Sequence, residues 1–344
     1  MAGSSPAMTC WGMAKASIAV VGGGAWGTAL ALVAARAGNS VRLWVREDEV
    51  VDAINARHEN PTFLPGVSLD AAITATDDFA ELGAPEAVLL VVPTQHVGEV
   101  ARELVRTLKA GTPIVICAKG IEQKGLKLPT EIVEAATASH PLAVLSGPSF
   151  AIDVARGLPT AITLACADQA LGRRLIDIIG LPAFRLYLSD DPKGAEIGGA
   201  VKNVLAIACG IVDGKGLGQS AKAALITRGF AEMARFGLAL GAKLETLTGL
   251  SGLGDLILTC SSTQSRNFSL GHAIGEGKHA ADVLAHRITV TEGAFTAPAL
   301  VALADRHKID MPITRGVDAI LRGRINADQA MEALLSRPTR SEGL

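Results

Sequence analysis

The sequence is poor in aromatic side chains and in net charge, and each shortage excludes a class of protein. Aromatic residues make up 3% of the 344 residues, too few for the base-stacking surfaces of proteins that bind single-stranded nucleic acid. The 32 lysines and arginines against 34 aspartates and glutamates leave a net charge of −2, so no basic field attracts nucleic acid. We therefore expect no nucleic-acid partner.

Cysteines are few and lie far apart along the chain. None of the five forms a CxxC or a zinc-ligand spacing with another, so the sequence predicts neither a disulfide framework nor a metal site. Cys117, Cys166 and Cys209 lie inside apolar runs, which is typical of buried thiols. Free thiols are typical of a reducing compartment, and we expect a cytoplasmic protein.

Long apolar runs are also lacking. The best candidate for a membrane span, 195–212, contains two charged residues and is shorter than the roughly 20 apolar residues that cross a bilayer. We therefore expect no membrane insertion. The first 15 residues have no basic segment followed by a long apolar one, so they do not fit a signal peptide. We interpret residues 1–16 as a flexible extension, in which translation could start at Met1, Met8 or Met13.

The first half of the chain alternates short apolar runs with longer amphipathic stretches. The apolar runs are continuous, which is typical of strands that are buried on both faces of a parallel sheet. A repeated order of strand, helix and strand predicts a doubly wound, Rossmann-like α/β domain, which we place at 17–190. The expected strands are 17–21, 41–45, 87–92, 113–117 and 142–145, and the expected helices are 25–37 and 96–109.

The second half of the chain has a different pattern. Residues 189–192 combine capping residues with a following proline, which predicts that a helix begins near residue 190. Long segments rich in alanine and leucine follow, with little strand character. We therefore expect an all-helical second domain at 191–344, with helices over 193–212, 219–240, 265–276, 295–307 and 315–322.

A glycine-rich motif directly follows the first expected strand. Residues 22–27, GGGAWG, fit the GxGxxG pattern and open an expected helix. Gly22 permits a tight turn, Gly24 lets the backbone approach a pyrophosphate, and Gly27 lets the helix and the strand pack closely. Amide groups at the helix N-terminus are then free to bind phosphate. In this context the motif predicts a dinucleotide-binding site.

The end of the second expected strand bears on the choice of cofactor. Folds that prefer NAD carry an acidic residue there, which binds the ribose 2′-hydroxyl. Arg46 holds the first such position, and its guanidinium would bind the 2′-phosphate of NADP(H). Alternatively, Arg46 is an ordinary surface residue and Glu47 contacts the ribose. We expect NADP(H) to be favoured, with NAD(H) as the other option.

Polar residues follow the later strands, whose carboxyl ends line the crevice of such sheets. His96 follows the third strand, but a lone histidine at a helix start is more often structural. Lys119 follows the next strand, where a cation would meet a substrate phosphate or the cofactor. The loop 146–151 after the strand beyond it offers backbone amides and hydroxyls to an anion. Turn chemistry alone is the alternative explanation for each.

The helical half contributes further candidates. Lys202 is a lone cation amid apolar residues, and partial desolvation would lower its pKa and suit it to acid–base work. Asp255 is an isolated acid that could hold a buried lysine. Arg266 and Asn267 follow a loop rich in serine and threonine, and a fork-shaped guanidinium suits a phosphate dianion. The structural alternatives are a lysine that reaches the surface, helix capping and a solvated arginine.

Together these residues lie in segments that resemble the bacterial NAD(P)-dependent sn-glycerol-3-phosphate dehydrogenases. The resemblance covers nearly the whole stretch 17–313, in the family's order and spacing, and the segments around Lys202 and Asp255 are far more specific than GxGxxG. The matching segments are GGGAWGTALA (22–31), NPTFLPG (60–66), ICAKGIE (116–122), LSGPSFA (145–151), GAEIGGAVKNVLAIACGIVDG (194–214), ALITRGFAEM (224–233), TLTGLSGLGDLILTC (246–260), SRN (265–267), VTEG (290–293) and MPI (311–313).

The resemblance implies a role for each matched residue. Lys202 matches the family's catalytic proton donor and acceptor. Ala25 stands where the family often has serine, which removes one hydroxyl contact, and Thr291 stands where valine is common. The positions that bind glycerol phosphate are matched by Lys119, Gly147, Ser149, Lys202, Asp255, Ser265, Arg266 and Asn267. The cofactor-contacting positions are matched by Ala25, Trp26, Arg46, Lys119, Ala151, Arg266, Val290 and Glu292.

The resemblance also implies an activity. It predicts a cytoplasmic oxidoreductase that interconverts dihydroxyacetone phosphate and sn-glycerol 3-phosphate and feeds glycerophospholipid synthesis, with a homodimer as one option for its assembly. The main alternative is another two-domain NAD(P)-dependent dehydrogenase for a hydroxy acid or sugar acid, which has no need of the Arg266 and Asn267 pair. A third option is a non-enzymatic NADP(H) sensor, but a sensor needs no proton donor such as Lys202.

Overall fold

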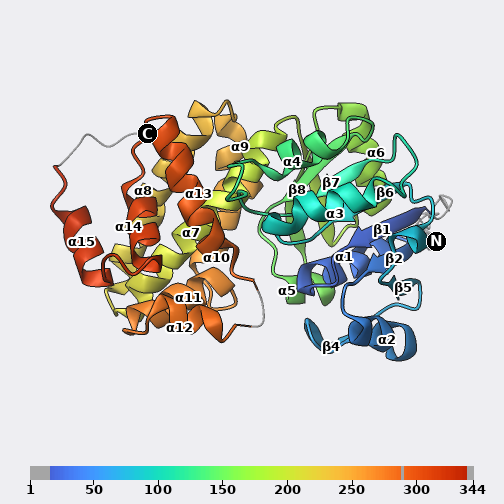
Figure 1. The fold of residues 1–344 in the computed structure, drawn as a ribbon, viewed down its shortest axis with the longest axis horizontal. Coiled ribbons are helices and arrows are strands. Elements are labelled where there is room, and N and C mark those ends of the chain that lie inside the picture. Colours follow the sequence, from blue (N-terminus) through green and yellow to red (C-terminus); the bar gives the residue numbers. More distant parts are fainter. Residues whose placement is uncertain (1–15, 288–289, 339–344) are drawn as a thin grey trace, which may run out of the picture.

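The computed structural model describes residues 16–287 and 290–338. Its first part is built on an eight-stranded sheet with strand order β10-β9-β8-β7-β6-β1-β2-β5, and its second part is made of helices (Figure 1). The fold class predicted from the sequence, a Rossmann-like α/β region followed by a helical region, is confirmed. Apart from Ala16, the expected extension 1–16 lies outside the described residues.

The central strands of the sheet are short, apolar and buried. All four side chains of β6 are buried, as are four of the five in β1, because helices cover both faces of the sheet there. A separate hairpin is formed by β3 (Glu59–Asn60) and β4 (Leu64–Ser68). The strands of the main sheet are β1 (Ser17–Val21), β2 (Ser40–Trp44), β5 (Ile73–Thr76), β6 (Ala87–Leu90), β7 (Ile114–Ile116), β8 (Leu142–Ser146), β9 (Thr160–Ala165) and β10 (Phe184–Ser189).

The five strands expected from the sequence pair in parallel, but β9 and β10, which the sequence pattern did not predict, add an antiparallel step near one edge of the sheet. β9 pairs with β8 antiparallel, with Val144 opposite Ala165, and β10 then pairs with β9 in parallel. A parallel return needs a crossover that runs the length of the sheet. The only helix between β8 and β9 in the described chain is α5 (Ala151–Ala155), which has 5 residues and is too short for that. The chain therefore turns back beside the strand it has just left.

Helices pack on both faces of this sheet and bury two separate cores. Ile18 and Val20 of β1 point to the face covered by α1 (Ala25–Arg36), α5 and α6 (Gln169–Ile179). The intervening Ala19 and Val21 point to the other face, which α3 (Val97–Leu104) and α4 (Pro129–Ala136) cover. The remaining helix of this region, α2 (Asp48–Arg57), lies beside β5 (Figure 1).

The helix expected over 96–109 is shorter than predicted. α3 ends at Leu104, and the backbone then tightens, since the amide of Thr107 bonds to the carbonyl of Leu104 at 3.1 Å. The Thr107 hydroxyl donates to the same carbonyl at 2.9 Å. Such local bonds compete with helical ones and end the helix early.

The helical region surrounds one buried helix, α7 (Pro192–Gly214). As predicted, this helix begins near residue 190, where the Asp191 carboxylate accepts from the Gly194 amide at 2.9 Å. Among the described residues α7 is the helix long and apolar enough to cross a membrane, but 94% of that stretch is buried inside the protein, as in a core helix. The others are α8 (Gly218–Ala239), α9 (Leu244–Thr248), α10 (Asp255–Cys260), α11 (Arg266–Gly275), α12 (Ala280–Ala285), α13 (Glu292–Arg306), α14 (Pro312–Leu321) and α15 (Ala327–Leu335).

Glycines let α11 lie directly on α7. A Cβ atom on Gly210 of α7 would stand 2.1 Å from the Phe268 carbonyl oxygen, and one on Gly271 of α11 would stand 2.0 Å from that of Ile207. The two backbones therefore touch, and no side chain fits between them. This close approach brings the start of α11, where Arg266 lies, next to the middle of α7.

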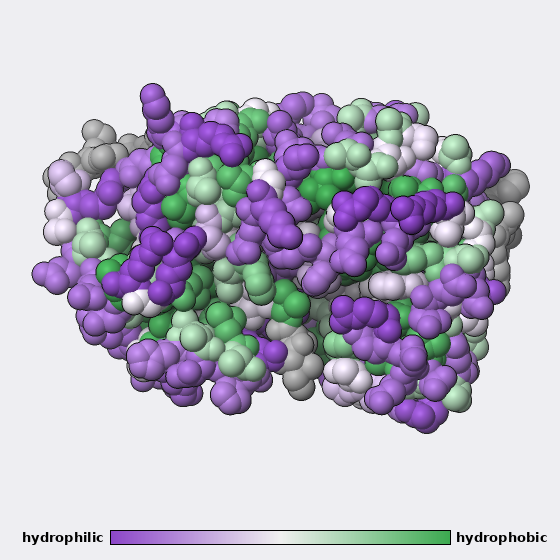
Figure 2. All heavy atoms as spheres, in the orientation of Figure 1, coloured by the Kyte–Doolittle hydropathy of each residue, from purple (hydrophilic) through white to green (hydrophobic). Residues whose placement is uncertain are grey.

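The surface is mostly polar in the orientation of Figure 2, with small and scattered hydrophobic patches. The predicted burial of Cys117, Cys166 and Cys209 is confirmed, and Cys260 is buried as well. All four thiols are free in the part of the chain that the structure describes.

Candidate active site

A buried lysine and a buried aspartate meet between α7 and α10. The side chain of Lys202 is 9% exposed, and its Nζ atom donates to Asp255 Oδ1 at 2.8 Å. The same ammonium donates to the hydroxyl of Thr259 at 2.8 Å, and that hydroxyl donates onward to Asp255 Oδ1 at 3.2 Å. Because all three side chains are held by one another, the ammonium group of Lys202 has a fixed position.

The second carboxylate oxygen of Asp255 accepts a hydrogen bond from another lysine. Lys119, which follows β7, donates from Nζ to Asp255 Oδ2 at 2.8 Å and to the carbonyl of Gly147 at 3.0 Å. The Ser149 hydroxyl donates to that carbonyl at 3.1 Å. The residues predicted after two strands of the sheet and those predicted in the helical half therefore meet around one carboxylate.

This arrangement shifts the pKa of both partners. Burial, helped by the nearby ammonium of Lys119 and opposed by Asp255, lowers the pKa of Lys202 to about 8. Burial alone would raise the pKa of Asp255, but the two ammonium groups outweigh it and hold that pKa below its ordinary value. Lys202 can thus gain or lose a proton near neutral pH while Asp255 stays ionised.

A single π-helical turn, Leu250–Gly254, brings Asp255 to this place. A Cβ atom on Gly252 would stand 2.0 Å from the Leu247 carbonyl oxygen, and one on Gly198 of α7 would stand 2.5 Å from that of Ser251. Only glycine allows the turn to close and to pack on α7. Such turns re-aim the residues that follow them and are frequent at functional sites.

Two asparagines tie the lysine centre to the C-terminal helices. Asn203, next to Lys202 on α7, donates from Nδ2 to the carbonyl of Lys119 at 2.9 Å. Its Oδ1 accepts from Asn267 Nδ2 at 2.8 Å, and Asn267 Oδ1 accepts from the amide of Gly293 at 2.9 Å. The relay fixes the start of α11 and the start of α13 relative to the two lysines.

Two family models together match most of the chain. The family model described as the N-terminus of NAD-dependent glycerol-3-phosphate dehydrogenase matches residues 17–172, and the one described as its C-terminus matches 191–332. The chain belongs to the NAD-dependent glycerol-3-phosphate dehydrogenase family.

Individual glycerol-3-phosphate dehydrogenases resemble the chain over its length. The enzyme of Parvibaculum lavamentivorans, named as using NAD(P)+, is 57% identical over 330 residues, which cover 96% of this chain and 99% of the relative. That of Rhodospirillum rubrum is 58% identical over 327 residues, covering 95% and 94%. The crystal structure of the Coxiella burnetii enzyme superposes with a TM-score of 0.90 at 43% identity, covering 94% and 99%. The predicted family and its nicotinamide cofactor are confirmed.

The glycine motif has the geometry that the cofactor of a glycerol-3-phosphate dehydrogenase needs. Gly22 has a φ of +124°, and a Cβ atom on Gly27 would stand 1.8 Å from its carbonyl oxygen, so the turn and the helix are tightly packed. A Cβ atom on Gly24 would instead meet no atom within 4 Å. No side chain caps α1 and no acidic residue lies in its first turn. The buried Nε1 atom of Trp26 has no partner among the described atoms. An uncapped helix start beside open space suits a pyrophosphate.

The other matched residues lie around this loop and the lysine centre. Arg46 is exposed and pairs with Glu47 at 3.0 Å, so neither alternative for the ribose contact is settled by their geometry. The carboxylate of Glu292 accepts from the Thr94 amide at 2.9 Å and interacts with the charge of Arg266. The other three matched residues are placed as follows: Ser265 caps α11, Ala151 is the first residue of α5, and Val290 is half-buried.

Several polar residues in the site carry no role from sequence reasoning. Asn203 and Thr259 contact the lysines directly, and Asn60 donates to the Gly23 carbonyl at 2.8 Å, which ties the β3–β4 hairpin to the glycine loop. All three lie inside the segments that resemble the family, and this position was the signal that could have marked them as candidate site residues. Their partners are distant in sequence, and spacing alone could not identify them.

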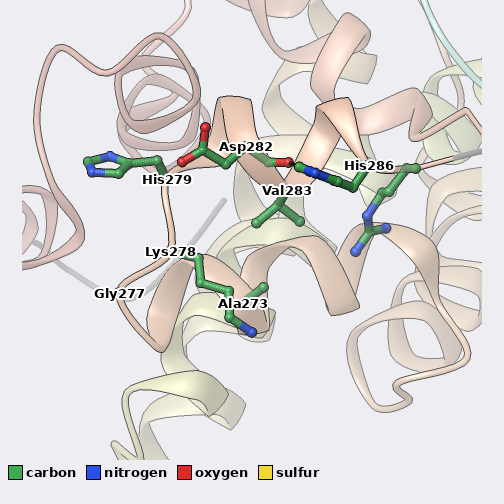
Figure 3. Close-up of a pocket in the computed structure, with 8 residues that line it drawn as sticks. Ala273, Gly277, Lys278, His279, Asp282, Val283 and His286 are labelled. Atoms are coloured by element: carbon green, nitrogen blue, oxygen red, sulfur yellow. Dashed lines mark hydrogen bonds between the residues drawn. The ribbon is translucent and has the colours of Figure 1, made fainter.

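A separate surface hollow of about 520 Å³ lies between α11 and α12 (Figure 3). Its cations are engaged elsewhere, since Lys278 pairs with Glu276 at 3.1 Å and Arg287 donates to Ser269 at 3.0 Å. Lys278 and His279 point in different directions in Figure 3. None of the predicted site residues lines it. Within the described residues, no group of three His, Cys, Asp or Glu side chains could hold a metal ion.

Proposed function

We propose that this chain interconverts dihydroxyacetone phosphate and sn-glycerol 3-phosphate with a nicotinamide cofactor, in the supply of glycerophospholipid precursors. The observation that carries the proposal is the buried Lys202, held by Asp255 beside Lys119. Family membership supports the substrate, and the uncapped start of α1 supports the cofactor.

Lys202 is the proton donor and acceptor of this reaction. The bound nicotinamide supplies the hydride that converts the ketone into the alcohol. As charge develops on the carbonyl oxygen, the ammonium of Lys202 stabilises it and then delivers a proton. Asp255 holds that ammonium in place, and a pKa of about 8 lets Lys202 exchange the proton in both directions.

Two different sets of groups bind the phosphate and the rest of the substrate. Arg266 and Asn267 open α11, and their donors suit a phosphate dianion together with the hydroxyl of Ser265. The rest of the substrate is bound by Gly147, Ser149 and the ammonium of Lys119. Binding the non-reacting end in this way converts affinity into orientation of the carbonyl.

The glycine loop Gly22–Gly27 and Lys119 would hold the cofactor. Trp26 and Ala151 would contact it from the sheet domain, and Val290, Glu292 and Arg266 from the helical region. The exposed Arg46 at the end of β2 favours NADP(H) over NAD(H), since its guanidinium, now paired with Glu47 at the surface, suits a 2′-phosphate.

We propose two domains, 17–190 and 191–344, which the separate matches of the two family models support. The enzyme works in the cytoplasm as a homodimer, without nucleic acid and without membrane insertion. Free buried thiols and the buried position of α7 support this placement.

One assay tests the proposal directly. Oxidation of NADPH and NADH is followed with dihydroxyacetone phosphate, with unphosphorylated dihydroxyacetone and with a 2-keto acid. We expect turnover with the phosphate ester alone, because the phosphate supplies the orienting contacts. Equal kcat/KM for the phosphorylated and unphosphorylated ketones would contradict the phosphate site. Turnover of the keto acid alone would support the hydroxy-acid alternative.

A further inference from the structure

Three buried oxygen atoms without hydrogen-bond partners gather behind the loop that carries Lys119. They are Thr94 Oγ1, Glu292 Oε2 and Thr296 Oγ1, each unpartnered among the described atoms. A Cβ atom on Gly120 would stand 2.6, 2.8 and 3.1 Å from them respectively. Both threonines are 0% exposed. Buried oxygens without a hydrogen-bond partner are rare and destabilising. Three of them around one point therefore indicate a functional role for the cluster.

The Glu292 carboxylate is only half satisfied in this arrangement. Its Oε1 atom accepts from the backbone amide of Thr94 at 2.9 Å, and its Oε2 atom faces the two hydroxyls. Burial raises the pKa of Glu292, and the Thr94 amide, the charge of Arg266 and the Thr94 hydroxyl only partly offset this. Two hydroxyl donors are the groups that a buried carboxylate still lacks, and a threonine can serve either protonation state.

The topology explains how the cluster forms. Thr296 lies four residues after Glu292 on α13, so both side chains lie on one face of the helix. Thr94 follows β6 and Gly120 follows Lys119, so the sheet supplies the other half. Gly120 is the position at which any side chain would push these oxygens apart.

We propose that Thr94 and Thr296 are positioning residues, which orient the Glu292 carboxylate so that it accepts a hydrogen bond from the bound cofactor. This inference rests on the proposed role of Glu292 as a cofactor contact. The charged group that acts on Glu292 is Arg266 of α11, while the nearby Lys119 directs its ammonium to Asp255. Because Gly120 has no side chain, these three oxygens can lie close together around one point.

Calorimetric binding of NADH and NADPH, without substrate and from pH 5 to 9, tests this role. Thr94→Val and Thr296→Val remove a hydroxyl and keep the shape of the side chain, and the Thr94 amide remains. We expect about tenfold weaker binding in each, because the variant lacks a hydroxyl that would donate to the charged carboxylate in the cofactor-bound enzyme. Without a donor the pKa of Glu292 rises further, so binding should also fail at a higher pH than in the wild type. Thr296→Ser restores the donor and should bind normally.

Two controls separate the possible failures. Thr112→Val removes a buried hydroxyl just before β7, at the opposite end of the strands from the cluster, and should change neither affinity nor pH dependence. Glu292→Gln tests the underlying contact: if it binds both cofactors as tightly as the wild type, the cofactor role of Glu292 is wrong and this inference falls with it. If Glu292→Gln weakens binding but both valine variants match the wild type in affinity and pH dependence, the positioning role alone is wrong. Thr296→Ala repeats the test should the valine variant not fold.

Discussion

Replacing Lys202 with methionine should abolish most of the catalytic activity while leaving the fold intact. Methionine keeps much of the apolar stem of lysine but carries neither a charge nor a proton. Loss of a general acid lowers kcat by about 10²–10⁴-fold. Loss of the positive partner of the developing oxyanion lowers it by about 10²–10³-fold. One group has both roles, so the two factors do not multiply in full, and we expect a loss of about 10⁴-fold.

The contacts of Asp255 show why this variant should still fold. Its Oδ2 atom keeps the ammonium of Lys119 at 2.8 Å and its Oδ1 atom keeps the hydroxyl of Thr259 at 3.2 Å, so no buried charge is left unpaired. Burial lowers the pKa of Lys202, which means that folding disfavours its charged form at neutral pH. A neutral methionine removes that penalty, and we expect the Tm to stay within a few degrees of the wild type.

The assay combines kcat for dihydroxyacetone phosphate with NADPH affinity and Tm. Lys222→Met is the matched control, because Lys222 also pairs with an aspartate, Asp213, at 2.9 Å, but outside the predicted site. It should keep nearly full activity. A folded Lys202→Met enzyme that binds NADPH and retains more than about a tenth of wild-type kcat would falsify Lys202 as the proton donor. Lys119 would then be the next candidate.

Three further predictions follow from particular contacts. Arg46→Asp should shift the ratio of kcat/KM from NADPH toward NADH, and an unchanged ratio would make Arg46 a plain surface residue. Gly271→Ala should lower the free energy of unfolding by about 3 kcal/mol, since its Cβ would stand 2.0 Å from the Ile207 carbonyl oxygen, whereas Gly316→Ala, with its nearest atom at 3.8 Å, should not destabilise the fold. Because Lys202 has a pKa of about 8, ketone reduction, which needs its charged form, should slow as pH rises through 8, and alcohol oxidation should speed up; parallel or flat pH profiles would contradict this.

The sequence was informative where local chemistry decides structure. The Asp191 cap, the glycine motif and the continuous apolar strands each depend on a few neighbouring residues, and each appears where expected. The antiparallel β9 could not be predicted in this way. Its direction depends on the short α5, and helix length is the least certain quantity in a sequence pattern.

In the candidate site, too, single residues could be predicted from the local sequence, whereas their long-range contacts could not. Lys202 and Asp255 stand out in the sequence because a charged residue in an apolar run is costly to bury unless it is paired. The sharing of Asp255 with Lys119 was not predictable, because it depends on a π-helical turn and on two glycines that let the turn reach α7. The role of Asn203 was hidden for a related reason: its partners lie on a strand end and on α11, far away in the sequence.

The pairing of two ammonium groups with one carboxylate explains two properties of the site together. While Lys202 is protonated, the buried centre carries one positive charge that Asp255 does not balance. That excess repels the proton of Lys202, which adds to the effect of burial and holds its pKa near 8. The same excess attracts a developing oxyanion, because charges interact strongly where water is excluded. A centre with one lysine and one aspartate would be neutral, would hold its proton more tightly and would offer an oxyanion less. We therefore infer that Lys119 contributes to proton transfer without donating the proton.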